Sequence, residues 1–177
     1  GDVLEIRYNV MIPWGFNGGR IYRVRYYDNV PSNTLMNIGL ADRLRIITNE
    51  GVPVFQYTLA TNDDAGSYDA LAVAPSYKIR INIGGAIGGL PGTPLNNTPT
   101  NTTGGGSLNL SGSGTGDIPR WWTGNLFSTA FRVTVAPLTY GQTITMGGGR
   151  LYYSTAASGG VTTFVPVPTF SVLIARN

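Results

Sequence analysis

The chain of 177 residues contains neither cysteine nor histidine. Without cysteine no disulfide can form, so the sequence carries no indication of its redox compartment. The two absences together remove the commonest zinc ligands, the usual general base near neutral pH and every Ser-His or Cys-His catalytic arrangement. We therefore expect neither metal-dependent hydrolysis nor triad catalysis, and the sequence indicates no cofactor.

Charged side chains are also scarce. They make up 12% of the residues, about half the usual share in soluble domains, and the chain has only nine acidic residues. Two carboxylates can perform glycosidase chemistry, but no pair stands out among these nine. The sequence therefore predicts a non-enzymatic protein.

Further absences limit the classes of partner. The net charge of +3 is too small to require a polyanionic partner, so a nucleic-acid function has no support. No apolar run approaches the roughly 20 residues that a membrane-spanning helix needs, and no positively charged leader precedes an apolar stretch. The chain begins at Gly1-Asp2, directly before a predicted strand. We interpret this start as a mature N-terminus left by signal removal or polyprotein cleavage, with a cloning product as the alternative.

The sequence does contain a series of strand patterns separated by turn residues. Phe131, Val133 and Val135 point to one face while Arg132 and Thr134 point to the other. The 25 glycines and 11 prolines punctuate such segments. The predicted strands before residue 84 are 3–12, 20–27, 43–48, 52–59, 70–74 and 77–83. Strands that recur with turns between them predict an all-β antiparallel sandwich of the Ig-like or jelly-roll type.

One segment interrupts this series. Residues 84–116 contain no charged side chain and almost no large one. Such a composition cannot bury enough apolar surface to offset its ordering entropy, so we predict a long loop rich in glycine, threonine and asparagine. A linker between two domains is the alternative. Because residues 117–177 would form only a marginal domain alone, we favour a single domain over 1–177 with 84–116 as a loop within it.

The second half of the chain carries a further pattern. The stretch "AFRVTVAPLTYGQTITMGGGRLYYS" begins at residue 130, and "FSVLIARN" begins at residue 170. Together they resemble the second half of the N-terminal receptor-binding domains of chaperone-usher fimbrial tip adhesins. In those domains an amphipathic strand ends in a small-Pro-aliphatic turn, and a short strand, a glycine turn, an "L-x-Y" strand and a final apolar strand follow. The match is carried by Val133, Val135, Pro137, Gly141, Ile144, Gly147, Leu151 and Leu173.

The resemblance implies a general role and no particular site residue. Many of these domains carry a disulfide, which this chain lacks, and the sugar-contacting residues of the mannose-binding type have no counterpart here. What the resemblance implies is a lectin-like sandwich that is exported through the periplasm and holds a host glycan or host surface protein at the tip of a fimbria. It also implies a following pilin domain and a periplasmic chaperone as partners. A viral jelly-roll capsid or spike domain is the alternative, since it would share the all-β, proline- and glycine-rich composition.

The stretch "DIPRWWTGN" at 117–125 is the first candidate site. In a strand Trp121 and Trp122 face opposite sides, so at most one of them belongs to the core of that sheet. An exposed indole can stack on a sugar while Asp117, Arg120 or Asn125 bonds its hydroxyls. Packing of both indoles under the loop is the alternative.

The stretch "RIYRVRYYDN" at 20–29 is the second candidate, because three arginines alternate with tyrosines. It suits an anionic receptor such as a sialylated glycan or, in a virus, RNA, although charge runs are commonly a solvated basic face. The strand model places Arg23 and Arg25 on one face with Ile21 and Tyr27, and it places Tyr22, Val24 and Tyr26 on the other. We assign ligand binding to the corner formed by Tyr26, Tyr27, Asp28 and Asn29.

A third stretch, residues 61–69, offers oxygen donors. Asp63, Asp64 and Asp69 form a weak candidate calcium site. Their spacing does not fit the EF-hand pattern, whose ligands alternate and end with glutamate at position twelve. Because Asn, Asp, Gly and Ser all favour turns, we predict a turn rather than a metal site.

Overall fold

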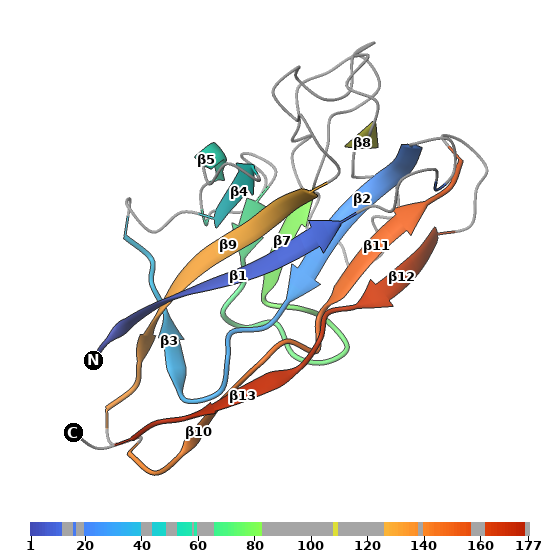
Figure 1. Ribbon diagram of the computed structural model, residues 1–177. Coiled ribbons are helices and arrows are strands. Elements are labelled where there is room, and N and C mark those ends of the chain that lie inside the picture. The colour runs from blue at the N-terminus through green and yellow to red at the C-terminus, as the bar shows by residue number, and fades with distance from the viewer. Residues whose placement is uncertain are drawn as a thin grey trace.

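The computed structural model describes residues 1–11, 16, 20–39, 44–48, 53–57, 59, 66–82, 108–109, 126–137, 140–156 and 162–175. Every regular element in this part of the chain is a strand, and every strand pair is antiparallel (Figure 1). The predicted all-β antiparallel fold class is therefore confirmed.

The first sheet is built around the longest strand, β9 (Leu126–Val135). Its order is β1-β9-β4-β5, and a short further strand also pairs with β9. Alternation explains its two faces, because Ile6 and Tyr8 of β1 are buried whereas Glu5 and Arg7 lie on the opposite side. The other strands are β1 (Val3–Met11), β4 (Leu44–Thr48), β5 (Pro53–Tyr57) and β3 (Thr34–Met36).

The second sheet has the order β12-β11-β2-β7-β6, and β8 also pairs with β2. Its central strand β2 (Arg20–Asp28) is flanked by β11 (Arg150–Ser154) and β7 (Ile79–Asn82). The outer strands are β12 (Thr162–Pro166), β6 (Gly66–Tyr68) and β8 (Leu108–Asn109). A separate pair joins β10 (Thr143–Met146) to β13 (Phe170–Leu173).

A single buried cluster joins residues of both larger sheets, an arrangement compatible with the predicted sandwich. The first sheet contributes Ile6, Tyr8, Leu44, Phe131 and Val133, the second Val24, Tyr26, Ile79 and Ile81, and β10 contributes Ile144 and Met146. The core is thus formed by the apolar sides of the alternating strands. Burial of apolar surface stabilises the folded state by about 25 cal/mol per Å².

The predicted strand at 70–74 is wrong. Leu71 and Val73 are exposed, and the segment forms turns instead. Asp69 begins the first turn, because its Oδ1 accepts the Leu71 N–H at 2.9 Å and its carbonyl accepts the Ala72 N–H at 3.3 Å. An aspartate side chain that mimics a backbone turn in this way outweighs the apolar alternation that follows it.

The predicted loop at 84–116 is not wholly irregular. Leu108 and Asn109 form β8, in which Leu108 pairs with Ile21 and Asn109 pairs with Arg20. The other residues of this segment lie outside the described part of the chain. The start of β1 and the end of β13 lie toward one end of the molecule, while β8 lies toward the other (Figure 1). Within the described residues no helix is long and apolar enough to cross a membrane.

Candidate functional site: a face of arginines and aromatic rings

The candidate site begins with the alternation of β2. Val24 and Tyr26 are buried in the core, so Arg25 and Tyr27 project from the opposite side of the sheet. This division is the one that the sequence predicts for 24–27. The side chains of 20–23 are not described.

The pairing register places arginines and tyrosines of the neighbouring strands beside Arg25 and Tyr27. Arg150 of β11 pairs with Tyr27, and Tyr27 pairs in turn with Arg80 of β7. Tyr152 of β11 lies between Arg25 and Phe164 of β12. With Tyr77, which precedes β7, these side chains form what we call the arginine–tyrosine face: Arg25, Tyr27, Tyr77, Arg80, Arg150, Tyr152 and Phe164.

Guanidinium groups and rings alternate across this face. The Tyr27 ring has the guanidinium carbons of Arg25 and Arg80 each 5.8 Å from its centroid. Arg25 also lies 5.2 Å from the centre of the Tyr152 ring. Cation–π contacts of this kind contribute about 0.5–2 kcal/mol each, depending on how far they are desolvated.

The aromatic rings also contact one another. Tyr27 lies 5.3 Å from Tyr152 and 6.0 Å from Tyr77, and Tyr152 lies 5.7 Å from Phe164, measured between ring centres. All three pairs are tilted rather than stacked. Tilted packing fixes the ring orientations and leaves the phenol groups available as hydrogen-bonding groups.

Exposure divides the face into a supporting part and an accessible part. Arg25 is only 4% exposed, and Arg80 is buried as well, so the solvated basic face considered for residues 20–29 is wrong for Arg25. Phe164 is 44% exposed, and Arg150, Tyr77 and Tyr152 are half-buried. The accessible part therefore lies on β11 and β12 and next to the start of β7.

Arg150 is the cation of the accessible part. Its guanidinium lies 4.2 Å from the centre of the Phe164 ring, and its Nη1 donates a hydrogen bond of 3.3 Å to the Tyr152 hydroxyl. The Tyr77 phenol interacts with the same guanidinium. Among the described residues Arg150 forms no ion pair. Its charge is thus oriented by aromatic neighbours and is not neutralised by a carboxylate of the described residues.

The corner assigned to ligand binding is mostly structural. Tyr26 and Asp28 are buried, so the expectation that these two contact a ligand is wrong. The Tyr26 hydroxyl donates to Asp28 Oδ2 at 2.6 Å, and the Asn29 N–H donates to Asp28 Oδ1 at 2.8 Å. Asn29 is exposed, but its Oδ1 accepts the Lys78 N–H at 3.2 Å and so ties the end of β2 to the segment before β7. Of the four residues only Tyr27 belongs to the arginine–tyrosine face.

The environment of Asp28 changes its acidity. Burial raises the pKa of this carboxyl to about 6, although the hydrogen bonds from Tyr26 and Asn29 act in the opposite direction. Gly149 packs directly against it, since a Cβ atom at Gly149 would come within 2.8 Å of Asp28 Oδ1. The carboxyl is therefore a core group that takes up a proton at a higher pH than an exposed aspartate does.

The remaining predicted site residues are only partly covered by the structure. Asp117, Arg120, Trp121, Trp122 and Asn125 lie outside the described residues, as do Asp63 and Asp64. Asp69 is described and forms the turn with Leu71. The described residues hold no group of three or more potential metal-ligating side chains.

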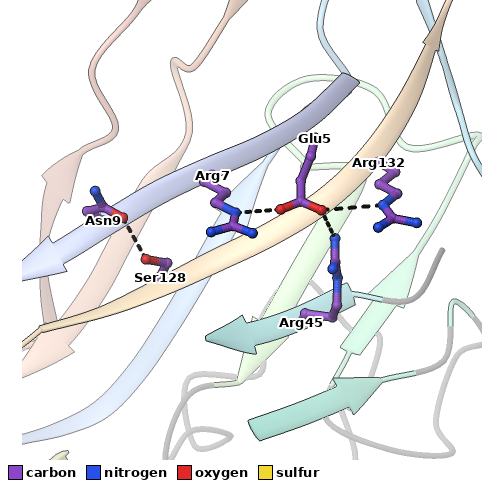
Figure 2. A network of polar contacts seen from close by, with 6 residues as sticks. All are labelled: Glu5, Arg7, Asn9, Arg45, Ser128 and Arg132. Carbon is purple, nitrogen blue, oxygen red and sulfur yellow. Dashed lines mark hydrogen bonds and ion pairs between the residues drawn. The ribbon is translucent and has the colours of Figure 1, made fainter. Parts of the chain in front are cut away.

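The first sheet carries a second cluster of arginines, shown in Figure 2. Glu5 on β1 forms ion pairs with Arg7 on the same strand, Arg45 on β4 and Arg132 on β9. Burial raises the pKa of Glu5, but hydrogen bonds from Arg45 and Arg7 outweigh this and lower it to about 2. Because Glu5 bridges three strands, we interpret the cluster as a cross-strand clamp and not as a ligand site.

Glu5→Gln is expected to lower the free energy of unfolding by about 1 kcal/mol, because it removes the carboxylate that pairs with the mostly buried Arg45. Arg7→Gln is the matched control. The Arg7 side chain is 49% exposed, so its loss should cost less than about 0.5 kcal/mol. Urea unfolding of both variants measures the difference. If both variants lose the same unfolding free energy, the ion pair between Glu5 and Arg45 adds no stability beyond that of the exposed pair between Glu5 and Arg7.

Sequence reasoning found one strand of the face and missed the others. Arg150 and Tyr152 alternate with Leu151 in the same way as Arg25 and Tyr27 alternate with Tyr26, and this repeated pattern was an available signal. No signal in the sequence pairs β11 with β2, since more than one hundred residues separate them. Tyr77, the first residue of the predicted strand 77–83, lies before β7 and packs 6.0 Å from Tyr27 on the outer side.

No family model matches the chain, and neither a curated protein nor a solved structure shows significant similarity to it.

Proposed function

We propose that the chain is the receptor-binding domain of a fimbrial tip adhesin, a non-enzymatic domain at the bacterial surface that binds a host glycan or a host surface protein. The observation that carries the proposal is the arginine–tyrosine face. It presents phenols and a guanidinium together with an exposed ring on one sheet, and phenols and N–H groups are hydrogen-bonding partners for sugar hydroxyls.

The order of elements in the second half of the chain supports the resemblance to these adhesins. Amphipathic β9 is followed by short β10, and a glycine turn leads from β10 to β11. The last described strand, β13, pairs with β10. Gly141 and Gly147, two of the residues that carry the resemblance, have φ values of +76° and +91°, which favour glycine at these turns.

Apolar side chains on the last two described strands support the implied partners. Phe170, Val172 and Leu173 of β13 and Val165 of β12 are all exposed. Exposed apolar side chains of this kind are available for contact with another domain. In this proposal a following pilin domain covers β13, and export through the periplasm uses a chaperone.

Tyr152→Ala is expected to lower binding to a positive glycan or host-matrix protein at least tenfold, since it removes the hydroxyl that orients Arg150 and the ring over which Arg25 lies. Binding is first screened on an array of host glycans and matrix proteins. Each ligand that binds is then titrated against the parent and the variant. Tyr140→Ala is the matched control, because Tyr140 is an exposed tyrosine outside the face. It should bind like the parent.

Two further variants test the site predicted first from the sequence. If Trp121→Ala or Trp122→Ala abolishes binding while Tyr152→Ala does not, the binding site lies in 117–125 and not on the arginine–tyrosine face. Melting temperatures of all variants separate lost binding from lost folding, because truncation of a core tryptophan costs about 3–5 kcal/mol. Absence of binding to every glycan and protein on the array would contradict the proposed function.

A further inference from the structure

We infer that Arg150, with Tyr77, Tyr152 and Phe164, forms a subsite for the anionic group of an acidic glycan, a carboxylate or a sulfate. The inference rests on the proposed function, since it names the class of glycan that the arginine–tyrosine face would bind. The subsite lies where β11 pairs with β12 and where Tyr77 approaches from the start of β7.

The first argument is the state of the Arg150 guanidinium. A guanidinium holds five N–H donors in a planar fork that matches two oxygens of a carboxylate or sulfate. Here one face lies over Phe164 and Nη1 donates to the Tyr152 hydroxyl, so the group is oriented before any ligand arrives. No carboxylate pairs with it in the described part of the chain. Preorganisation of this kind lowers the entropy cost of binding.

The second argument is the charge around the subsite. The described acidic residues are Asp2, Glu5, Asp28 and Asp69. Glu5 lies on the other sheet, and Asp28 is buried on the core side of β2, where it accepts hydrogen bonds from the Tyr26 hydroxyl and the Asn29 N–H. The guanidinium groups of Arg80 and Arg25 lie next to Tyr27 on the same side of the sheet as Arg150.

The arrangement of the rings favours a glycan over RNA. Single-stranded RNA binds through bases that stack on free aromatic faces. The Tyr27, Tyr152 and Phe164 rings instead have the protein's own guanidinium groups over them and pack against each other at a tilt. The groups left at the surface are phenols and N–H donors, which suit sugar hydroxyls and anionic oxygens.

The experiment compares acidic and neutral sugars on the same multivalent support. Polyacrylamide conjugates of 3′-sialyllactose, of a heparin-derived tetrasaccharide and of lactose are titrated by biolayer interferometry against the whole chain. At least one acidic conjugate should bind at least tenfold more tightly than the lactose conjugate, and Arg150→Gln should remove that preference. Arg150→Lys keeps the positive charge but loses the planar array of guanidinium N–H donors. This variant should therefore keep only part of the preference for acidic conjugates. Arg7→Gln removes the same charge from the other sheet and should have no effect.

Each outcome has a distinct meaning. Binding of 3′-sialyllactose identifies a carboxylate as sufficient. Binding of the heparin fragment without binding of 3′-sialyllactose indicates a sulfate, since both sugars carry carboxylates and only the heparin fragment carries sulfates. Equal binding of acidic and neutral conjugates, unchanged in Arg150→Gln, would overturn the anionic subsite and leave the proposed adhesin function standing. Binding of poly(U) that depends on Arg150, without binding of either acidic conjugate, would overturn the choice of glycan. If no sugar and no host protein binds at all, both the function and the subsite are wrong.

Discussion

Gly147→Ala is expected to lower the free energy of unfolding by about 2–5 kcal/mol. Two costs add at this position. The φ of +91° lies in the left-handed region, where an L side chain costs about 1–2 kcal/mol. A Cβ atom would also overlap the backbone of the connection between β12 and β13, because it would lie 2.8 Å from the Pro168 carbonyl carbon and 3.0 Å from Thr169 Cα. Overpacking of this kind costs about 1–3 kcal/mol more.

Gly141→Ala separates these two costs. Its φ of +76° carries a similar backbone penalty, but no atom lies within 4 Å of the added Cβ. We expect a loss of about 1 kcal/mol, since alanine also reduces the freedom of the unfolded chain. Urea unfolding with an unchanged m-value gives both numbers. If the two variants lose equal stability, the close approach of the glycine turn to Pro168 contributes nothing.

Much of the fold could be predicted because most strands have one polar and one apolar side. The alternation in β9 placed Phe131 and Val133 together on one face of a strand, and both are buried. Ile6 and Tyr8 of the predicted strand 3–12 alternate with polar residues in the same way and are buried as well. The same logic failed at 70–74, where a single hydrogen bond from the Leu71 N–H to the Asp69 side chain selects a turn. Periodicity reports burial over a whole segment, whereas a turn is decided by one local contact.

The candidate site was less predictable because it is assembled by register between distant strands. Arg25 and Tyr27 were found in the sequence, but Arg150 and Tyr152 join them only through the pairing of β11 with β2. Asp28 illustrates the opposite error. An aspartate in a "YDN" turn looks like an exposed polar group, yet it is buried against the Tyr26 hydroxyl and Gly149. Whether a side chain at the end of a strand is buried depends on the residues of other strands that pack against it. A local sequence pattern does not reveal those residues.

The buried Asp28 also predicts how stability changes with pH. Its pKa is raised from 3.8 in the unfolded chain to about 6 in the folded protein. The folded state therefore binds the proton more tightly, and the stability that this provides is fully present below the unfolded pKa and is lost as the pH rises through 6. The protein should be more stable at pH 4.5 than at pH 8, with Asp28 contributing about 2 kcal/mol of the difference.

Two features of the chain make this measurement clean. It contains no histidine, so no other side chain has an ordinary pKa between 5 and 8. Glu5 acts in the opposite direction, because its pKa is lowered from 4.5 to about 2, but its contribution is lost only as the pH falls below about 4.5. Asp28→Asn is the decisive variant, since asparagine cannot titrate and still offers one oxygen to the Tyr26 hydroxyl. Urea unfolding from pH 8 to 4.5 should show stability rising in the parent and nearly constant in Asp28→Asn. A parallel rise in both proteins would assign the pH dependence to another group.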